Sequence, residues 1–259
     1  IAFMGNVHPD EQIRDFGNEA DSKIQNLALE IFKDEELYKK FQEIQTDNLD
    51  DESKSFYKDL EIDFKDAGHG LTDEKKSRLM EIEKKLIDLG ISFSENIAKD
   101  KTEVLFIEDE LKGLSQNELQ NLRRNKDRFV ITMAYPDINA VMENCSVRAT
   151  REIVWKAFNN RAVEKNSPIL EEAVVLRNEK AVLFGFKTWA EYRLQNRMAK
   201  SPESVASMYE SLIPKLQKAA EVEKNKLAKD NIEISDIAPW DIRYFISKER
   251  SEVSNIEIR

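Results

Sequence analysis

The sequence predicts a mainly α-helical fold, a multi-helix array with one small β insertion. Glycine (7) and proline (6) are scarce among the 259 residues, and charged residues make up 35%. A composition low in Gly and Pro and rich in Glu, Lys, Leu and Ala favours helices. Apolar residues also recur at helical spacing along most of the chain, and only two short segments are rich in β-branched and aromatic residues.

The N-terminal segment, residues 8–44, predicts one long helix. Pro9 suits the first turn, and the acidic Asp10 and Glu11 suit its positive end. Its apolar stripe consists of Ile13, Phe16, Ala20, Ile24, Leu27, Ile31 and Leu37. A second helix is expected over residues 48–68, ending near Gly68.

The clearest helical pattern covers residues 71–100, where Thr72 can cap the N-terminus. The side chains expected to be buried there are Leu79, Ile82, Leu86, Leu89, Phe93 and Ile97. The spacing then changes, and short, possibly paired strands are predicted near residues 103–107 and 128–133, with a helix over about 115–124 between them.

After Pro136 the pattern returns to helix. Further helices are expected over residues 146–162, 167–184, 188–198, 201–230 and 237–250. Pro168 lies near the start of one, Ser201 and Pro202 suit the cap and first position of another, and Pro214 should bend it. No repeat or flexible linker interrupts residues 1–259, which predicts a single helical portion.

Charge and composition exclude several classes of function. The net charge is −10, which disfavours nucleic acid and anionic membrane surfaces as partners. No apolar run reaches the roughly 18 residues of a membrane span, and the N-terminus does not resemble a signal peptide. The one cysteine, Cys145, allows no intrachain disulfide, which favours a reducing compartment.

The residues themselves form no complete active site. A common zinc protease site needs two histidines at positions i and i+4 of one helix, but His8 and His69 are the only histidines, and both are expected to be solvated. Cys145 has no histidine near it in sequence. Neither GxSxG nor a P-loop is found. We therefore assign no catalytic, cofactor-binding or metal-binding residue.

Three other groups of residues have ordinary structural explanations. Acidic runs occur at Asp50–Glu52, Glu108–Glu110 and Glu171–Glu172, and in a chain with 50 acidic residues they are expected to be solvated. The aromatics Trp155, Phe158, Phe184, Phe186, Trp189 and Tyr192 are expected to be core. Arg148, Arg151 and Arg161 could hold a carboxylate or cap helix ends, and structural ion pairing is the favoured interpretation.

A more specific signal comes from eight short motifs in one order. They are Thr150–Arg151, Phe158–Asn159–x–Arg161, Asn166–x–x–Ile169–Leu170, Leu176–Arg177 with Ala181, Phe184–Gly185–Phe186, Ala190–x–Tyr192, Met198–Ala199–Lys200–Ser201–Pro202 and Trp240–Asp241–x–x–Tyr244. In order and spacing they resemble the thimet oligopeptidase family of zinc metallopeptidases (M3). Residues 6–21 and 70–97 add to the resemblance, which covers nearly the whole chain.

The resemblance implies a zinc metalloendopeptidase that hydrolyses short peptides. The acidity of the chain and the absence of an Arg-rich presequence favour the cytoplasm, with the mitochondrial matrix as the alternative. In that family an HEFGH helix and a downstream Glu hold Zn²⁺, and both follow the Trp-Asp-x-x-Tyr segment. This chain stops at Arg259, before them. The resemblance therefore implies that residues 1–259 form the N-terminal helical portion, one wall of the substrate channel. The metal ligands would lie in a missing C-terminal catalytic portion, and this chain alone would be inactive.

A function of another class stays open. The chain could be a stand-alone, non-catalytic helical module that binds peptides or a partner helix. Such a module would expose apolar surface where the rest of the enzyme would otherwise dock.

Overall fold

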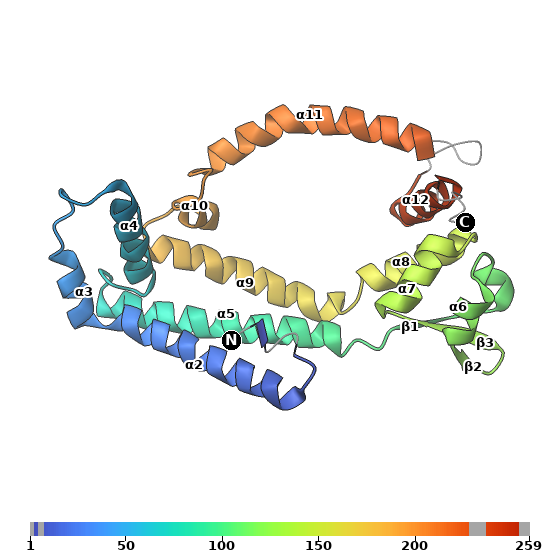
Figure 1. Ribbon diagram of the computed structural model, residues 1–259, viewed down its shortest axis with the longest axis horizontal. Coiled ribbons are helices and arrows are strands. Elements are labelled where there is room, and N and C mark those ends of the chain that lie inside the picture. Colours follow the sequence, from blue (N-terminus) through green and yellow to red (C-terminus); the bar gives the residue numbers. More distant parts are fainter. Residues whose placement is uncertain (1–2, 5–7, 228–236, 254–259) are drawn as a thin grey trace. The chain divides into compact units, whose positions relative to one another are not determined.

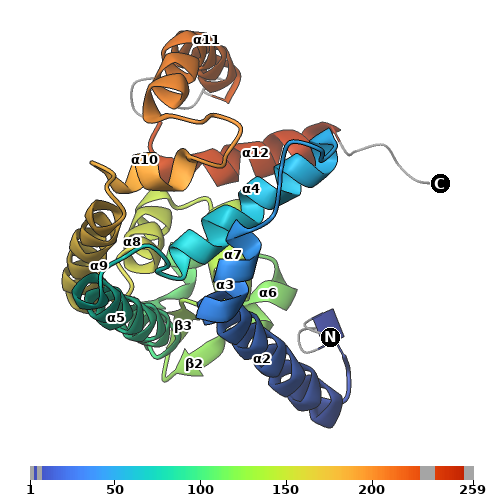
Figure 2. The same cartoon turned by 90° about the vertical axis from the view of Figure 1, so that its left-hand side faces the viewer.

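A computed structural model describes residues 3–4, 8–227 and 237–253. Within these ranges the chain is mainly helical with one small three-stranded sheet, so the predicted fold class is confirmed. The chain divides into two compact units, Ile1–Lys85 with Leu176–Lys200, and Leu86–Val175 with Ser201–Arg259. The boundary between the units falls within helices α5 (Asp73–Ala98) and α9 (Val163–Leu183). Within each unit the two helices lie side by side, joined by Arg78 with Glu179 in the first and by Asn166 with Phe93 in the second (Figures 1 and 2).

The first unit holds α2, α3, α4, α10, the beginning of α5 and the end of α9. The bounds of the elements named for the first time are α2 Glu11–Lys33, α3 Glu35–Gln42, α4 Asp51–Asp66 and α10 Trp189–Leu194. Its core is built on Phe64, whose ring centroid lies 5.2 Å from that of Phe32 and 5.0 Å from that of Phe41. Leu79 and Ile82 of α5 are buried as predicted.

The prediction of one helix over residues 8–44 is wrong, because the helix is broken at Asp34. Asp34 has extended backbone angles (φ −70°, ψ 114°), and its carboxylate accepts a hydrogen bond from the Leu37 amide at 2.8 Å. An aspartate that satisfies a free amide in this way starts a new helix. Asp10 likewise caps α2 rather than lying inside it. Much of the predicted apolar stripe is exposed, including Phe16 at 70%.

Two other expectations hold for α4 and α5. Gly68 follows α4 with φ of 103°, a left-handed conformation that ends the helix as predicted. The Thr72 hydroxyl accepts from the Lys75 amide at 3.4 Å and so caps α5. Leu89 is buried, whereas Leu86, Phe93 and Ile97 are half-buried.

The second unit contains the sheet. Strand β1 (Glu103–Phe106) and strand β3 (Arg128–Thr132) lie in the two predicted segments and pair antiparallel, with Val104 opposite Ile131. The short strand β2 (Arg123–Asn125) extends the other side of β3 and was not predicted. The connection from β1 to β2 carries the 3₁₀-helix η1 (Glu108–Leu111) and α6 (Gln116–Asn121).

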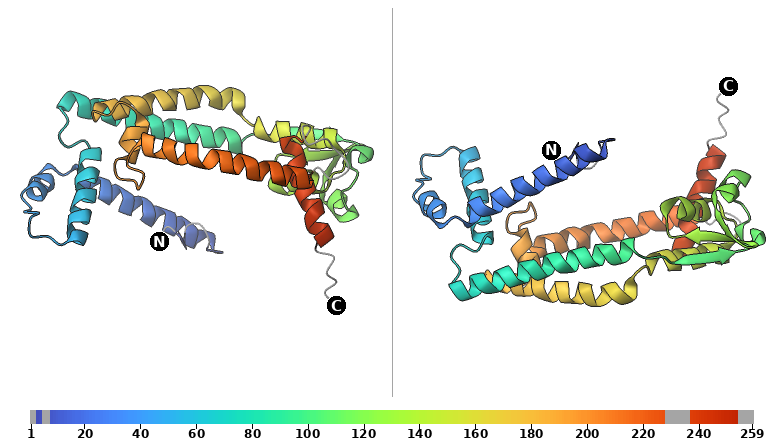
Figure 3. Two further views of the ribbon diagram at one scale, coloured as in Figure 1. Left: turned by 90° about the horizontal axis from the view of Figure 1, so that it is seen from above. Right: turned by 90° about the horizontal axis from the view of Figure 1, so that it is seen from below.

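Helix α7 (Tyr135–Asn144) packs on this sheet and α8 (Arg148–Asn159) packs on α7, while α12 (Pro239–Val253) packs on both helices (Figure 3). The shared core consists of Phe106, Leu111, Leu114, Leu119, Leu122, Phe129, Ile131, Met133, Ile138, Val141, Met142, Cys145 and Val154. The β insertion and the helices after it therefore form one hydrophobic core.

The chain passes very close to itself at Gly113. Its φ is 101°, and a Cβ atom there would lie 2.3 Å from the Asn144 carbonyl oxygen and 2.9 Å from the Ser146 amide. The Ser146 amide donates to the Lys112 carbonyl at 2.7 Å across the same approach. Only glycine fits this position, which joins the loop before α6 to the turn between α7 and α8.

The helices that contain proline differ in part from expectation. α9 begins at Val163, so Pro168 lies inside it rather than at its start. α11 (Pro202–Leu227) begins at Pro202, and the Ser201 hydroxyl accepts from the Ser204 amide, as predicted. α11 continues through Pro214 and curves along its length (Figure 1). Residues 228–230 of the predicted helix lie outside the described residues.

The sheet core gives a test of this fold. Ile131 is fully buried and Ile107 is 42% exposed. We expect Ile131→Ala to lower the free energy of unfolding by about 2–5 kcal/mol, because the deletion leaves a cavity, and Ile107→Ala to cost well under half of that. Urea unfolding, followed by the fluorescence of Trp155 and Trp240 in a Trp189→Phe background, measures both. Equal losses for the two variants would contradict the assigned core.

Candidate functional site

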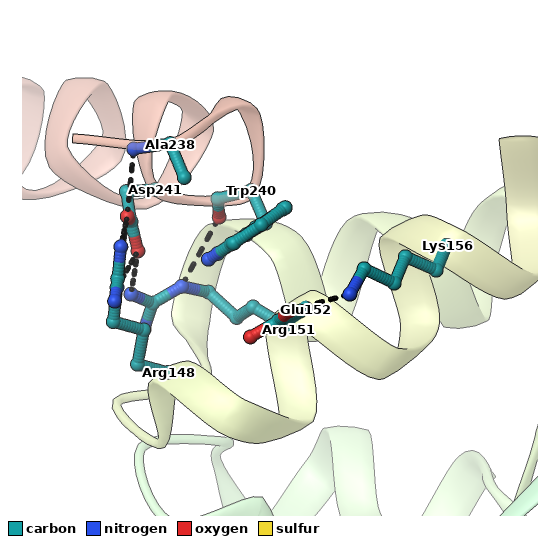
Figure 4. Close-up of polar contacts among 7 residues, drawn as sticks. All are labelled: Arg148, Arg151, Glu152, Lys156, Ala238, Trp240 and Asp241. Atoms are coloured by element: carbon teal, nitrogen blue, oxygen red, sulfur yellow. Dashed lines mark hydrogen bonds and ion pairs between the residues drawn. The ribbon is translucent and has the colours of Figure 1, made fainter. Parts of the chain in front are cut away.

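The first turn of α12 and helix α8 meet at a buried carboxylate. Asp241 is completely buried and accepts hydrogen bonds from two arginines of α8 (Figure 4). Arg151 Nη2 donates to Oδ1 at 2.7 Å, and Arg148 Nε donates to Oδ2 at 3.0 Å. The Ala238 amide, at the start of the same turn, donates to Oδ2 at 3.1 Å.

Arg151 is buried as deeply as its partner, with 3% of its side chain exposed. Its Nη1 donates to the Cys145 carbonyl at 2.8 Å and its Nε to the Trp240 carbonyl at 3.2 Å. Its guanidinium carbon also lies 4.2 Å from the ring centroid of Tyr244. All three nitrogens are therefore engaged, and the end of α7, α8 and α12 are joined at this one side chain.

The local fold explains why these residues meet. Arg148 and Arg151 are three positions apart and so lie on one face of α8. Asp241 lies in the first turn of α12, where a negative charge is stabilised by the helix dipole. The favoured interpretation of Arg148 and Arg151 as structural ion pairs is thus confirmed. Asp241 was known only as part of a motif, and its partners could not be named from one sequence.

The electrostatics of the cluster keep Asp241 charged. Burial raises the pKa of its carboxyl, but the hydrogen bonds from Arg148 and Arg151 lower it by more, so the pKa lies below its usual range. A buried charge with this many partners is fully compensated. The cluster therefore holds helices together and offers no free cation to a substrate.

The neighbouring Cys145 is not a nucleophile. Its side chain is buried, and burial raises the pKa of the thiol above its ordinary value. The Sγ atom lies 3.4 Å from the Glu110 carbonyl, to which the Thr150 hydroxyl also donates at 2.7 Å. Since the thiolate is the reactive form, this protonated thiol is a packing residue.

The two histidines do not form a metal site. His8 is half-buried, and its Nδ1 accepts from the Asp10 amide at 3.1 Å. The prediction that His69 is solvated is wrong: it is 8% exposed, stacks on Tyr38 and donates from Nε2 to the Phe32 carbonyl at 2.8 Å. Among residues 3–4, 8–227 and 237–253 no three His, Cys, Asp or Glu residues lie close enough together to hold a metal. The described side chains therefore do not fit the zinc that the resemblance implies.

Of the aromatic residues near the Phe184–Phe186 break, Tyr192 is core in the first unit, whereas Phe184, Phe186 and Trp189 are half-buried around it. Tyr192 is buried, and the rings of Phe184, Phe186 and Trp189 all lie within 5.5 Å of its own ring. Burial and the neighbouring Asp66 raise the pKa of the Tyr192 hydroxyl. Gly185 turns the chain with φ of 85°. The opening of α10 thus packs against the end of α9.

The acidic runs are exposed, as predicted, and two of them help to form helix starts. Asp50 caps α4 by accepting from the Ser53 amide at 2.7 Å, and the residues after it occupy the first turn. The run from Glu108 forms η1. Met198 is fully exposed. Arg161 Nε donates to the Phe158 carbonyl at 2.9 Å in the last turn of α8, so Arg161 helps to end that helix.

The buried cluster predicts that two acidic residues, Asp241 and Glu143, contribute very differently to the free energy of unfolding. We expect Asp241→Asn to cost about 3–5 kcal/mol of unfolding free energy, because it leaves buried Arg151 without a counter-charge. Glu143→Gln, which removes the exposed ion pair with Arg243, should cost about 1 kcal/mol or less. Urea unfolding of both variants measures the difference. If Asp241→Asn lowered the unfolding free energy by less than Glu143→Gln does, the cluster would contribute nothing to stability.

The same carboxylate predicts a dependence on pH. The pKa of Asp241 is lowered in the folded state, so its contribution to stability is fully present above the unfolded value of about 3.9 and is lost as pH falls through the lower, folded value. The difference in unfolding free energy between wild type and Asp241→Asn should therefore shrink below about pH 4. Acid titrations of both proteins, followed by fluorescence, test this, and a difference that stays constant down to pH 2 would contradict it.

No helix in the described ranges is long and apolar enough to cross a membrane. Residues 141–258, which contain the whole buried cluster, match Peptidase family M3. Similar proteins include a thimet-like oligopeptidase of Dictyostelium discoideum, 32% identical over an alignment of 238 positions that covers 88% of this chain and 35% of that protein.

Saccharolysin of Saccharomyces cerevisiae is 27% identical over 280 residues, covering all of this chain and 39% of the relative. Oligopeptidase A of Salmonella typhimurium is 30% identical over 213 residues, covering 75% of this chain and 31% of the relative. The chain thus spans about a third of the length of these curated relatives. The order and spacing of the eight motifs agree with the family match and with the identity to these relatives, and the chain belongs to peptidase family M3.

Proposed function

We propose that this chain is a section of a zinc metallo-oligopeptidase that hydrolyses short peptides, and that it forms part of the wall of the substrate channel. The support is its family and the names of its relatives, which are oligopeptidases. Because the chain spans about a third of those relatives, the peptidase activity is proposed for the whole protein and a shaping role for this section.

The observation that carries the shaping role is the buried cluster. The motifs Thr150–Arg151 and Trp240–Asp241–x–x–Tyr244 lie about 90 residues apart in the sequence, yet their charged groups bind each other directly. Their bonding capacity is used within the protein, so they fix α8 against α12 and cannot also bind a substrate. A rigid wall made of helices requires contacts of this kind, which hold two helices at one position relative to each other.

No catalytic step is assigned to the described residues. Zinc in the family would polarise the substrate carbonyl and activate water, with a glutamate as general base. The described side chains provide no ligand set for that ion. The cytoplasm is the proposed compartment, with the mitochondrial matrix as the alternative, in keeping with an acidic chain whose single cysteine is free.

A second candidate function is a non-catalytic module that binds peptides or a partner helix. One observation favours it. Helix α11 has no buried residue. The large apolar side chains that it exposes are Met208, Tyr209, Leu212, Ile213, Leu216 and Val222. Exposed apolar residues on one helix are typical of a surface that a partner covers.

The two candidates make different predictions for peptide cleavage. We expect the purified 259-residue chain to show no chelator-sensitive cleavage of a short quenched fluorescent peptide, since its described residues include no group of side chains that could ligate a metal. We expect the product of the complete open reading frame to cleave that peptide in a zinc-dependent manner, while leaving a folded protein substrate intact.

Each other outcome counts against the proposal. Chelator-sensitive cleavage by the 259-residue chain would place the chemistry within it. An open reading frame that ends at Arg259, or a longer product without zinc-dependent peptidase activity, would favour the binding module instead. A product that digests folded proteins would contradict the channel wall.

A further inference from the structure

The second unit contains a cavity of about 310 Å³ between the end of α5 and the junction of α8 with α9. The residues that matter here are Phe93, Ile97, Phe158, Asn159, Arg161 and Leu170. Two motifs of the family resemblance, Phe158–Asn159–x–Arg161 and Asn166–x–x–Ile169–Leu170, thus lie around one cavity. The volume is at the lower end of the range for small-molecule sites.

The guanidinium of Arg161 is held in place but not saturated. Its Nε donates to the Phe158 carbonyl at 2.9 Å, and its central carbon lies 3.8 Å from the centroid of the Phe158 ring. Within the described ranges, its two terminal nitrogens have no hydrogen-bond acceptor. An arginine fixed in this way presents a planar pair of donors, which is the geometry that a carboxylate binds.

The backbone beside Arg161 is strained. Ala162 has φ of 54°, a left-handed conformation that is costly for a residue with a Cβ atom. Its amide donates to Asp100 Oδ2 at 3.0 Å, so Asp100 stabilises the turn. The charges of Asp100 and Arg161 also attract each other, with no hydrogen bond between them in the described residues. Backbone strain of this kind is common at binding sites, because it fixes a side chain where it is needed.

The rest of the cavity is mainly apolar. Phe93 and Ile97 of α5 form one side, and Leu170 of α9, which is 52% exposed, lies at the rim. No acidic side chain is among its lining residues, although the Asp100 carboxylate lies near enough to Arg161 for the two charges to attract each other. Asn166 is already engaged, since its Nδ2 donates to the Phe93 carbonyl and its Oδ1 accepts from Asn96.

Asn159 provides the cavity with one hydrogen-bond acceptor, its Oδ1 atom. Its Nδ2 donates to the Trp155 carbonyl at 2.8 Å, which leaves its Oδ1 without a donor in the part of the chain that the structure describes. Oδ1 can therefore accept from an amide N–H of a ligand. A carboxylate next to an apolar side chain and an amide N–H is the C-terminal residue of a peptide.

We propose that this cavity binds the C-terminal residue of a short peptide with an apolar last side chain, its carboxylate held by Arg161. The apolar and carboxylate parts of the ligand follow from the cavity alone, whereas its peptide nature rests on the proposed function. Asn159 Oδ1 accepts the amide N–H of that residue, and Phe93, Ile97 and Leu170 contact its side chain.

The test measures binding rather than cleavage, so it is independent of whether the whole protein is a peptidase. N-acetyl-leucine is titrated into the 259-residue chain and its dissociation constant is measured by ligand-observed NMR. N-acetyl-leucinamide, which lacks the carboxylate, and 4-methylpentanoate, which lacks the amide, are titrated in parallel. We expect N-acetyl-leucine to bind saturably and each of the other two to bind at least about tenfold more weakly.

Variants locate the site. Arg161→Gln should weaken N-acetyl-leucine at least about tenfold. The matched control Arg243→Gln, which removes an exposed arginine paired with Glu143, should leave its affinity unchanged. In case Arg161→Gln disturbs the end of α8, Leu170→Glu places a negative charge at the exposed rim and should abolish binding while the circular dichroism stays that of wild type.

Four results would overturn the proposal. N-acetyl-leucinamide binding as tightly as N-acetyl-leucine would exclude recognition of the carboxylate. Equal binding of 4-methylpentanoate would make this a site for simple carboxylic acids and would exclude a peptide ligand. No saturable binding of N-acetyl-leucine, or unchanged binding by both the Arg161 and Leu170 variants, would remove the site itself.

Discussion

The second unit depends on one buried carboxylate. Asp241 has no exposed surface, and transferring such a charge from water costs several kcal/mol unless partners replace the lost hydration. Arg148 and Arg151 supply them, but only when α12 lies across α8 at one position. A buried ion pair of this kind adds little net stability over apolar packing, and what it supplies is the requirement for a single arrangement. Arg151 extends that requirement to the end of α7 through the Cys145 carbonyl.

Much of the fold could be predicted because the signals are local. Helix α5 combines a Thr72 cap with an apolar stripe that includes fully buried Ile82, and β1 and β3 stand out by their β-branched residues. The elements that were predicted wrongly depend on tertiary contacts or on a local interaction that competes with the helix. Strand β2 is three polar residues that form a strand only because the edge of β3 is available. The break at Asp34 reflects one side chain that competes for a backbone amide.

The sites were less predictable, for a related reason. The spacing of Arg148 and Arg151 indicated that both could face the same partner, but the partner lies 90 positions away along the chain from Arg151. His69, between two glycines, was predicted to lie in a solvated turn, and its burial depends on stacking against Tyr38 of α3. Motif order identified the family without saying which residues contact one another. That information is held in the tertiary contacts.

The motif residues differ in how much hydrogen-bonding capacity their contacts within the protein leave for a ligand. All three guanidinium nitrogens of Arg151 donate hydrogen bonds to acceptors within the protein, and Asp241 is surrounded by donors. These two side chains therefore stabilise the fold and have no hydrogen-bonding capacity left for a ligand. Arg161 uses one nitrogen, Nε, to donate to the carbonyl of Phe158, and its side chain is among those that line a mainly apolar cavity. Since a buried polar group is costly unless it is satisfied, an arginine that is held in place yet unsaturated at a half-buried position has capacity for a ligand. Within this section of a peptidase-family chain, capacity to bind a peptide therefore lies at Arg161 rather than at the more conspicuous arginines of α8.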